Sequence, residues 1–255
     1  CIRDRVKIVD IGHDNFDSAC EALELGSVDM AVVDMVQLIR MEKNDENLPY
    51  GVVISGVLKR GDSRYVMIRK RHAKDLIENA VVATDSYSKT ERIKHMYDGI
   101  SCVVETDIRK CIEKLDASEC DAVFVLLEDI KAARLHNSFL YRYTIMDYGE
   151  CVPVHGEGVY AMLTKGKKEA VRTARELSHK STAECFEIED DIISRVMQNV
   201  YVKTCDVYAR ISSDRLEIYA DVTGNRGRIR VNERGTFVNK NLIITKIVDR
   251  ISKSM

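Results

Sequence analysis

Short apolar runs alternate with amphipathic stretches along the first quarter of the chain. Three apolar runs of strand length lie at residues 6–11, 28–33 and 51–58. Residues 15–25 carry apolar side chains at helical spacing, and this pattern stops at Gly26. The pattern predicts strands separated by helices, and the run at 28–33 is typical of a buried strand.

The same alternation continues through the middle of the chain. Strands are predicted at residues 80–84, 100–104 and 121–127, with helices at 88–96 and 107–115 between them. The last of these strands is apolar throughout, as expected for a strand buried on both faces. A later run at 159–163 is predicted to return to the first sheet. This order predicts an α/β fold in which helices cover a parallel or mixed sheet.

The pattern changes after residue 166. Helices are predicted at residues 167–179, 182–198 and 241–252, and strands at 206–211, 215–222 and 228–231. Gly224 and Asn225 form a turn signal between two of the strands, which indicates an antiparallel hairpin. The C-terminal part is therefore predicted to be a separate, small α+β domain.

Composition narrows the class of protein. The 255 residues are 45% hydrophobic and 31% charged, with 39 Lys and Arg against 41 Asp and Glu. This balance lacks the basic excess of a nucleic-acid binder, and no apolar run approaches the roughly 20 residues that span a bilayer. A cytoplasmic location is expected, since no signal peptide pattern follows Cys1. The absence of Met at position 1 leaves open a longer parent chain.

Cysteine and acidic residues give no metal-site pattern. None of the eight cysteines forms a CxxC motif, so free thiols are expected and no metal is predicted. Glu187, Glu189, Asp190 and Asp191 are interpreted as the solvent face of a helix. His155 is interpreted as a solvated loop residue beside a simple turn at residues 156–158.

Several phrases, taken in order, resemble one protein family. They are SVDMAVVDMVQLI (27–39), LKRGDSR (58–64), VVATDSYSK (81–89), EKLDASECDAVFVLL (113–127), VPVHGEGVYAM (152–162), ELSHKSTAE (176–184), CDVYARI (205–211) and LEIYADV (216–222). Their order and spacing resemble hydroxymethylbilane synthase, also called porphobilinogen deaminase, over essentially the whole chain.

The resemblance implies two periplasmic-binding-protein-like α/β lobes and a small C-terminal α+β domain. Lobe one would comprise residues 1–58 with 149–163, lobe two residues 59–148, and the third domain residues 167–255. Family members hold a dipyrromethane cofactor through a cysteine thioether and extend it with four porphobilinogen units, releasing ammonia at each step. Such a site needs cations for the pyrrole carboxylates and an aspartate for the cationic intermediates.

The slot of the family's catalytic aspartate is changed. It falls on Gln37, which cannot supply a negative charge. Asp34 lies three residues earlier and, on an extended segment, would face the opposite side. The resemblance thus offers Asp34 and Gln37 as the candidate catalytic residues, with Asp34 as a substitute only if the chain turns there.

The cofactor-binding slots are also changed. One phrase falls on Thr84, Ser86, Ser88 and Lys89, where both arginines of the family are replaced and only Lys89 keeps a positive charge. Asp85 adds a negative charge in the same phrase, and Asp107 stands for the family's asparagine. Glu105 and Cys111 replace two further arginines.

The anchoring cysteine is displaced as well. Its slot falls on Val200 or Tyr201, and Cys205 lies four or five positions later. The slots assigned to the cofactor are therefore Thr84, Ser86, Ser88, Lys89, Asp107, Tyr201 and Cys205. The replacements lead us to expect no dipyrromethane cofactor in this chain.

Three hypotheses follow. The first is a degenerate family member that keeps the fold, lacks the parent catalysis, and binds a small pyrrole or other anionic ligand. The second is an active porphobilinogen-polymerising transferase whose site is altered or is completed upstream of Cys1. The third is a small-anion binding module without catalysis. A monomer with no nucleic-acid or membrane partner is expected.

Overall fold

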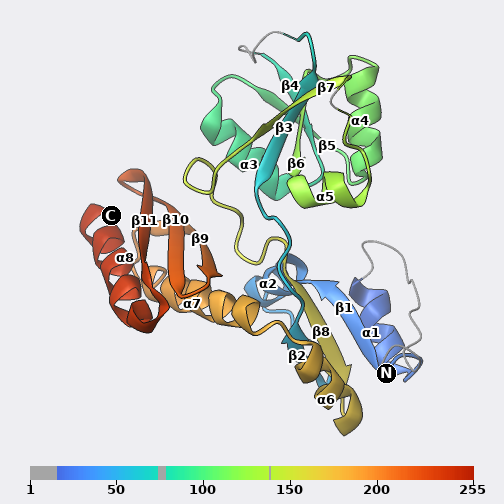
Figure 1. The fold of residues 1–255 in the computed structure, drawn as a ribbon, viewed down its shortest axis with the longest axis vertical. Coiled ribbons are helices and arrows are strands. Elements are labelled where there is room, and N and C mark those ends of the chain that lie inside the picture. Colours follow the sequence, from blue (N-terminus) through green and yellow to red (C-terminus); the bar gives the residue numbers. More distant parts are fainter. Residues whose placement is uncertain (1–15, 74–78, 138) are drawn as a thin grey trace. The chain divides into compact units, whose positions relative to one another are not determined.

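A computed structural model describes residues 16–73, 79–137 and 139–255 (Figure 1). The predicted strand at 6–11 lies outside the described residues. Helices are α1 (Phe16–Glu24), α2 (Met35–Lys43), α3 (Tyr87–Met96), α4 (Ile108–Asp116), α5 (Leu127–Ala132), α6 (Lys168–Leu177), α7 (Lys180–Val196) and α8 (Lys240–Ser254). Strands are β1 (Met30–Asp34), β2 (Val52–Val57), β3 (Tyr65–Lys70), β4 (Val81–Thr84), β5 (Ser101–Val104), β6 (Ala122–Leu126), β7 (Tyr141–Ile145), β8 (Tyr160–Lys165), β9 (Val202–Ser212), β10 (Arg215–Gly224) and β11 (Gly227–Thr236).

The chain divides into two compact units, each described here by itself. Unit 1 comprises residues 1–59 and 159–183, and unit 2 comprises residues 60–158 and 184–255. Residues 149–158, predicted for lobe one, group with unit 2, and residues 167–183, predicted for the third domain, group with unit 1. The three-domain division implied by the resemblance stays a prediction.

Unit 1 contains an antiparallel sheet with the order β1-β8-β2. The predicted return of the chain to the first sheet is confirmed, since β8 lies between the two earlier strands. The expectation that the first of these strands is buried is only half right, because Val32 is 52% exposed while Ala31 and Val33 are buried. Antiparallel sheets often solvate one face, which explains this alternation.

Unit 2 contains a five-stranded mixed sheet with the order β5-β4-β6-β3-β7. Its parallel members β5, β4 and β6 were predicted from the sequence, and β6 is buried throughout. Val123 and Val125 pack on the α4 side, whereas Ala122 and Phe124 pack on the α3 side. Helices cover both faces of this sheet, so the α/β class is confirmed.

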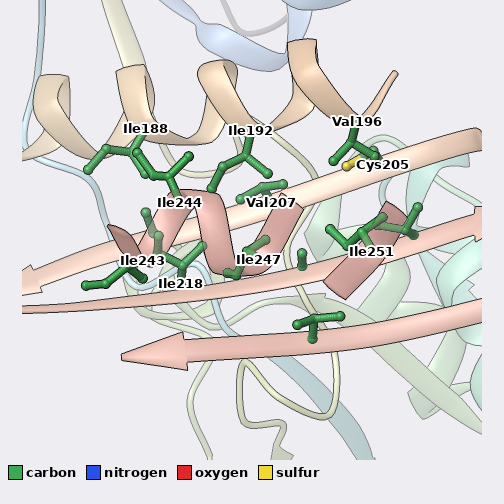
Figure 2. Packing of buried hydrophobic residues seen from close by; sticks show 14 of the residues in the cluster. Ile188, Ile192, Val196, Cys205, Val207, Ile218, Ile243, Ile244, Ile247 and Ile251 are labelled. Carbon is green, nitrogen blue, oxygen red and sulfur yellow. The ribbon is translucent and has the colours of Figure 1, made fainter. Parts of the chain in front are cut away.

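The C-terminal part of unit 2 contains the antiparallel sheet β11-β10-β9 and helices α7 and α8. Leu216, Ile218, Ala220 and Val222 alternate along β10 and point into one core. Figure 2 shows this core, where isoleucines of α7 and α8 meet the inward face of the strands. The predicted hairpin turn is confirmed, since Gly224 pairs with Gly227. An antiparallel sheet with helices is the α+β composition predicted for the C-terminal part.

Candidate functional site

The carboxyl edge of the parallel strands in unit 2 gathers several of the predicted cofactor residues. Strand β4 ends at Thr84 and α3 begins three residues later, while β5 ends at Val104 and is followed by α4. Adjacent parallel strands end at one edge of a sheet, so Thr84, Ser86 and Asp107 belong to the same edge. Helix N-termini favour anions at such an edge. The backbone therefore offers an anion site, and the side chains decide whether it is used.

Lys89 is buried at this edge and is already paired. Its Nζ lies 2.7 Å from both carboxylate oxygens of Asp85 and 3.7 Å from Oε1 of Glu157. Only 4% of its side chain is exposed. Burial by itself lowers the pKa of Lys89, but Glu157, Asp85 and Asp129 outweigh that effect and raise it. Lys89 therefore stays charged, and its charge is directed at the protein's own carboxylates.

Glu157 is the member of this group that the sequence did not identify. Its carboxylate accepts a hydrogen bond of 3.2 Å from the Tyr65 hydroxyl, and its backbone carbonyl accepts one of 2.9 Å from Ser63 Oγ. Burial, and then Glu157, raise the pKa of Tyr65. The turn at residues 156–158 thus has a second role, because it carries a buried carboxylate to Lys89. Only the long-range pairing of the loop with β3 could reveal this.

The other slots at this edge are filled by local contacts. Thr84 is buried, Ser86 precedes α3 and its Oγ lies 3.1 Å from that of Ser88, and Ser88 is half-buried. Asp107 caps α4, since its Oδ1 accepts a hydrogen bond of 2.8 Å from the Arg109 backbone N–H. Cys111 is fully buried, and burial raises the pKa of its thiol to about 12. These side chains add no positive charge to the edge.

Asp34 and Gln37 lie in unit 1 at the junction of β1 and α2. Asp34 ends the strand and caps the helix, because its Oδ1 accepts a hydrogen bond of 2.8 Å from the Val36 backbone N–H. Of the two alternatives, the chain turns at Asp34 and enters a helix that the apolar pattern did not predict. Gln37 lies in the first turn of that helix, so both side chains belong to the same helix end. Their catalytic role stays a prediction.

The anchor slot does not fit a thioether-linked cofactor. Val200 and Tyr201 are exposed in the turn before β9, and neither side chain has a thiol. Cys205 is buried in the core of the C-terminal part, where Figure 2 shows it beside Val196. A cysteine that carries a chain of pyrroles has to reach solvent or a cleft, and a core thiol does not. The residues at these positions therefore do not match the group that the family uses.

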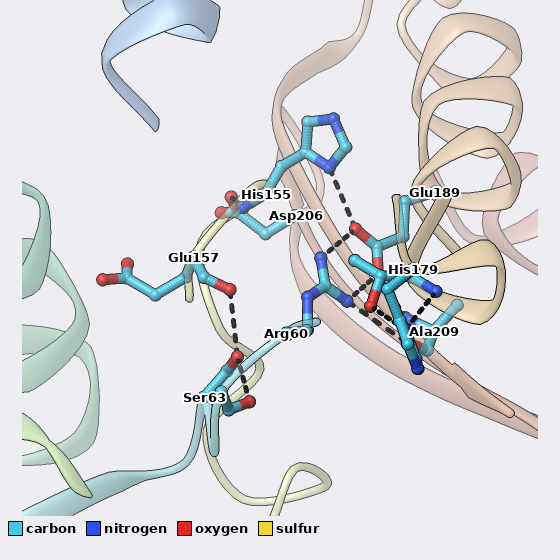
Figure 3. A network of polar contacts seen from close by, with 10 residues as sticks. Arg60, Ser63, His155, Glu157, His179, Glu189, Asp206 and Ala209 are labelled. Carbon is cyan, nitrogen blue, oxygen red and sulfur yellow. Dashed lines mark hydrogen bonds and ion pairs between the residues drawn. The ribbon is translucent and has the colours of Figure 1, made fainter. Parts of the chain in front are cut away.

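A second ionic group in unit 2 corrects two interpretations from the sequence. Glu189 is fully buried and not on the solvent face, and His155 is buried and not solvated. Arg60 donates two hydrogen bonds to Glu189, of 2.5 and 2.8 Å, and the Ala209 backbone N–H donates a third of 2.7 Å (Figure 3). Burial alone raises the pKa of Glu189, but Arg60 and then His155 outweigh it and lower it. This carboxylate is structural, because its oxygens accept hydrogen bonds from Arg60 and from the Ala209 backbone N–H.

His155 lies against this group through its ring. The imidazole stacks on Phe186 with centroids 4.7 Å apart, and its Nδ1 lies 3.4 Å from Oε2 of Glu189. A lone loop histidine gives no such signal in the sequence, since its burial depends on α7 packing over the loop. Within the described residues, no group of three or more His, Cys, Asp or Glu is placed to hold a metal ion. None of the described helices is long and apolar enough to cross a membrane.

Comparison with known proteins places this fold and these residues in a family. Residues 12–173 match the model of "Porphobilinogen deaminase, dipyromethane cofactor binding domain". The porphobilinogen deaminase of Chlorobium luteolum is 24% identical over 74% of this chain and 60% of its own length. That of Clostridium acetobutylicum is 22% identical over 80% of this chain and 74% of its own. The chain thus spans about 60% of the first of these relatives.

Solved structures show weaker likenesses. The BvgS VFT2 domain of Bordetella pertussis, as a double mutant, is 16% identical over 69% of this chain and 72% of its own, with a TM-score of 0.45. The amino acid ABC transporter substrate-binding protein AbpA of Streptococcus pneumoniae, bound to L-arginine, is 14% identical over 71% of this chain and 72% of its own, with a TM-score of 0.42. The family match covers more than half of the sequence and agrees with the phrases that the sequence presents in order. The chain belongs to the porphobilinogen deaminase family.

Proposed function

We propose that this chain is a porphobilinogen deaminase-like protein that has lost the parent catalysis and carries no dipyrromethane. In place of that chemistry it binds a small pyrrole or another anionic ligand. The observation that carries this proposal is the state of Lys89, the one cation kept at the family's two arginine slots. Its charge is neutralised by Asp85 at 2.7 Å and faces Glu157 at 3.7 Å.

The electrostatic argument follows from the ligand of the parent reaction. Each pyrrole unit carries an acetate and a propionate, so the growing chain is strongly negative. At this edge Asp85, Glu157 and Asp129 act on a single ammonium group, which makes the local balance negative. Like charges at short range oppose the binding of a polyanion, and removing one preorganised charge-stabilising group typically costs about 10²–10³ in rate.

The anchor supports the same conclusion. Neither exposed residue at the family's slot has a thiol, and Cys205 lies in a hydrophobic core. An active transferase would need a thiol outside these positions or a site completed by another segment. The family membership alone supports that alternative.

Intact mass spectrometry of the purified protein tests the cofactor part of the proposal. We expect the mass of the unmodified chain, and an added mass of two linked pyrroles would contradict the proposal. If an adduct appears, Cys205→Ser and Cys102→Ser distinguish the core thiol from the partly exposed one.

Incubation with porphobilinogen tests the catalytic part separately. We expect no product that oxidises to a coloured porphyrin, while a saturable thermal shift with porphobilinogen would support binding without turnover. Coloured product from protein without an adduct would overturn the loss of catalysis and leave the absence of cofactor standing. No shift with porphobilinogen or any other small anion would reject the binding function.

A further inference from the structure

The outer face of the C-terminal sheet holds an ionic group that the proposed function does not use. Asp221 of β10 is only 4% exposed and stands in register with Asp206 of β9 and Arg230 of β11. Arg92 of α3 and Arg228 of β11 also lie within ion-pair distance of its carboxylate. Three guanidinium groups therefore surround one buried carboxylate, with Asp206 as a second.

Two of the three guanidinium groups are engaged by the protein. Arg228 donates from Nε to Asp221 Oδ1 at 2.7 Å and from Nη2 to Oδ2, and its Nη1 lies 3.4 Å from the His95 carbonyl oxygen. Arg92 Nη2 lies 2.5 Å from Asp206 Oδ2, and its Nη1 lies 3.8 Å from Asp221. The Arg92 side chain is 7% exposed, and its Nε is buried with no hydrogen-bond partner among the described residues. Two carboxylates thus leave one of three positive charges uncompensated.

Arg230 is the group left open. Its guanidinium has one ion-pair contact within the described part of the chain, from Nε to Asp221 Oδ2 at 3.5 Å, and 38% of its side chain is exposed. Asp221 cannot neutralise it fully, because both of its oxygens already accept from Arg228. A guanidinium carries five N–H donors, so the Nη edge of Arg230 is available to a ligand.

We propose that Arg230 is the contact residue of a binding site for a small oxyanion, since Asp206 and Asp221 are already paired with Arg92 and Arg228. The planar Nη edge matches two oxygens of a carboxylate or phosphate group, and such charge-assisted pairs are stronger than neutral hydrogen bonds. Partial burial increases the attraction, since water screens the charge of Arg230, with 38% of its side chain exposed, less than that of a fully exposed side chain. The site lies on the face of the C-terminal sheet opposite its hydrophobic core and does not depend on whether catalysis is lost.

Titration of the full chain with sodium propionate and with sodium phosphate, at constant ionic strength set by chloride, tests the site. Side-chain Nε–Hε resonances of arginine are followed by NMR. We expect a saturable shift of the Arg230 signal with one or both anions, and the two arms tell a carboxylate from a phosphate preference. Arg230→Gln should weaken binding about tenfold or more, since it removes a charge-assisted pair.

The matched control is Arg234→Gln. Arg234 lies on the same face of the same strand, opposite Glu217, so its loss changes net charge equally. It should weaken binding less than twofold. Equal weakening by both variants, or a linear response of the wild type without saturation, would overturn the proposal. If Arg230→Gln does not fold, Arg230→Lys keeps the charge and removes the paired donors, and unchanged affinity in that variant would also contradict the site.

Discussion

Two ionic groups in unit 2 combine basic side chains with carboxylates and reach opposite charge balances. At the edge of the five-stranded sheet, one ammonium group, Lys89, faces the carboxylates of Asp85 and Glu157. On the outer face of the C-terminal sheet, three guanidinium groups share Asp221 and Asp206. In the first group the carboxylates neutralise the one positive charge. In the second group one positive charge is not neutralised.

The difference teaches that a basic residue in a family slot does not by itself make an anion site. Lys89 keeps its charge at the expected place, yet its neighbours use it. Arg230 lies outside the slots taken from the resemblance, yet it remains open. A third group, Arg60 with Glu189, is balanced and almost completely buried. Four predictions test this contrast, from the largest expected effect to the smallest.

Breaking the balanced group should cost the most stability. Glu189→Gln keeps the shape of the side chain but removes the negative charge paired with Arg60, whose side chain is 8% exposed. The free energy of unfolding should fall by about 3–5 kcal/mol, measured by urea denaturation. Asp190→Asn on the same helix is the control, since its side chain is 65% exposed and should change stability by less than about 0.5 kcal/mol. Equal effects of the two variants would contradict the buried pair.

Removing the cation at the sheet edge should cost less and should depend on pH. Lys89→Met leaves the carboxylates of Asp85 and Glu157 near each other. The Asp85 side chain is 15% exposed, so water screens part of their repulsion. We expect a loss of about 2–3 kcal/mol at pH 7. A loss of less than about 0.5 kcal/mol would argue against this balance.

The contribution of Lys89 to the stability of the wild type depends on pH. Its folded pKa is raised, so its contribution to stability is fully present below the pKa of the unfolded chain and is lost as the pH rises through the folded value. The stability difference between the wild type and Lys89→Met should therefore decrease in strong alkali.

Removing the carboxylate that pairs with Lys89 should create an anion-binding site at this edge. Asp85→Ser removes the carboxylate that holds Nζ and should cost about 1 kcal/mol. The variant should bind propionate at the start of α3, seen as saturable NMR shifts of the Ser86 and Lys89 amides that the wild type does not show. Glu91→Gln, an exposed change on the same helix, should gain no such binding. If Asp85→Ser gains none either, the neutralisation of Lys89 does not explain the lost site.

The smallest effect concerns an outer pair in unit 2. Hydrogen bonds from Arg64, and then from Lys131, lower the pKa of Asp62 to about 2. Its contribution is present above the ordinary pKa of an aspartate and is lost as the pH falls through about 2. Asp62→Asn should lower the free energy of unfolding by less than about 1 kcal/mol at pH 5, because solvent screens the ion pair. The loss should be smaller still at pH 3. Asp98→Asn is the exposed control, and an equal loss of stability in both variants would reject the pairing.

Most of the element order could be predicted from the sequence alone. The strands β4, β5 and β6, the hairpin of β10 and β11, and the closing helix follow from apolar period and turn residues, which are local properties. The family was also readable, because its phrases keep their order even where single residues change. Short helices such as α2 and α5 were missed, since their first residues continue an apolar strand pattern.

Which charges are neutralised depends on packing in three dimensions. The burial of Glu189 and His155, the approach of Glu157 to Lys89, and the sharing of Asp221 join residues far apart in the chain. No local pattern encodes these distances, because they result from how loops and helices pack on the sheets. Since the availability of a charge depends on its neighbours in space, the sequence could indicate where cations are but not which of them a ligand can reach.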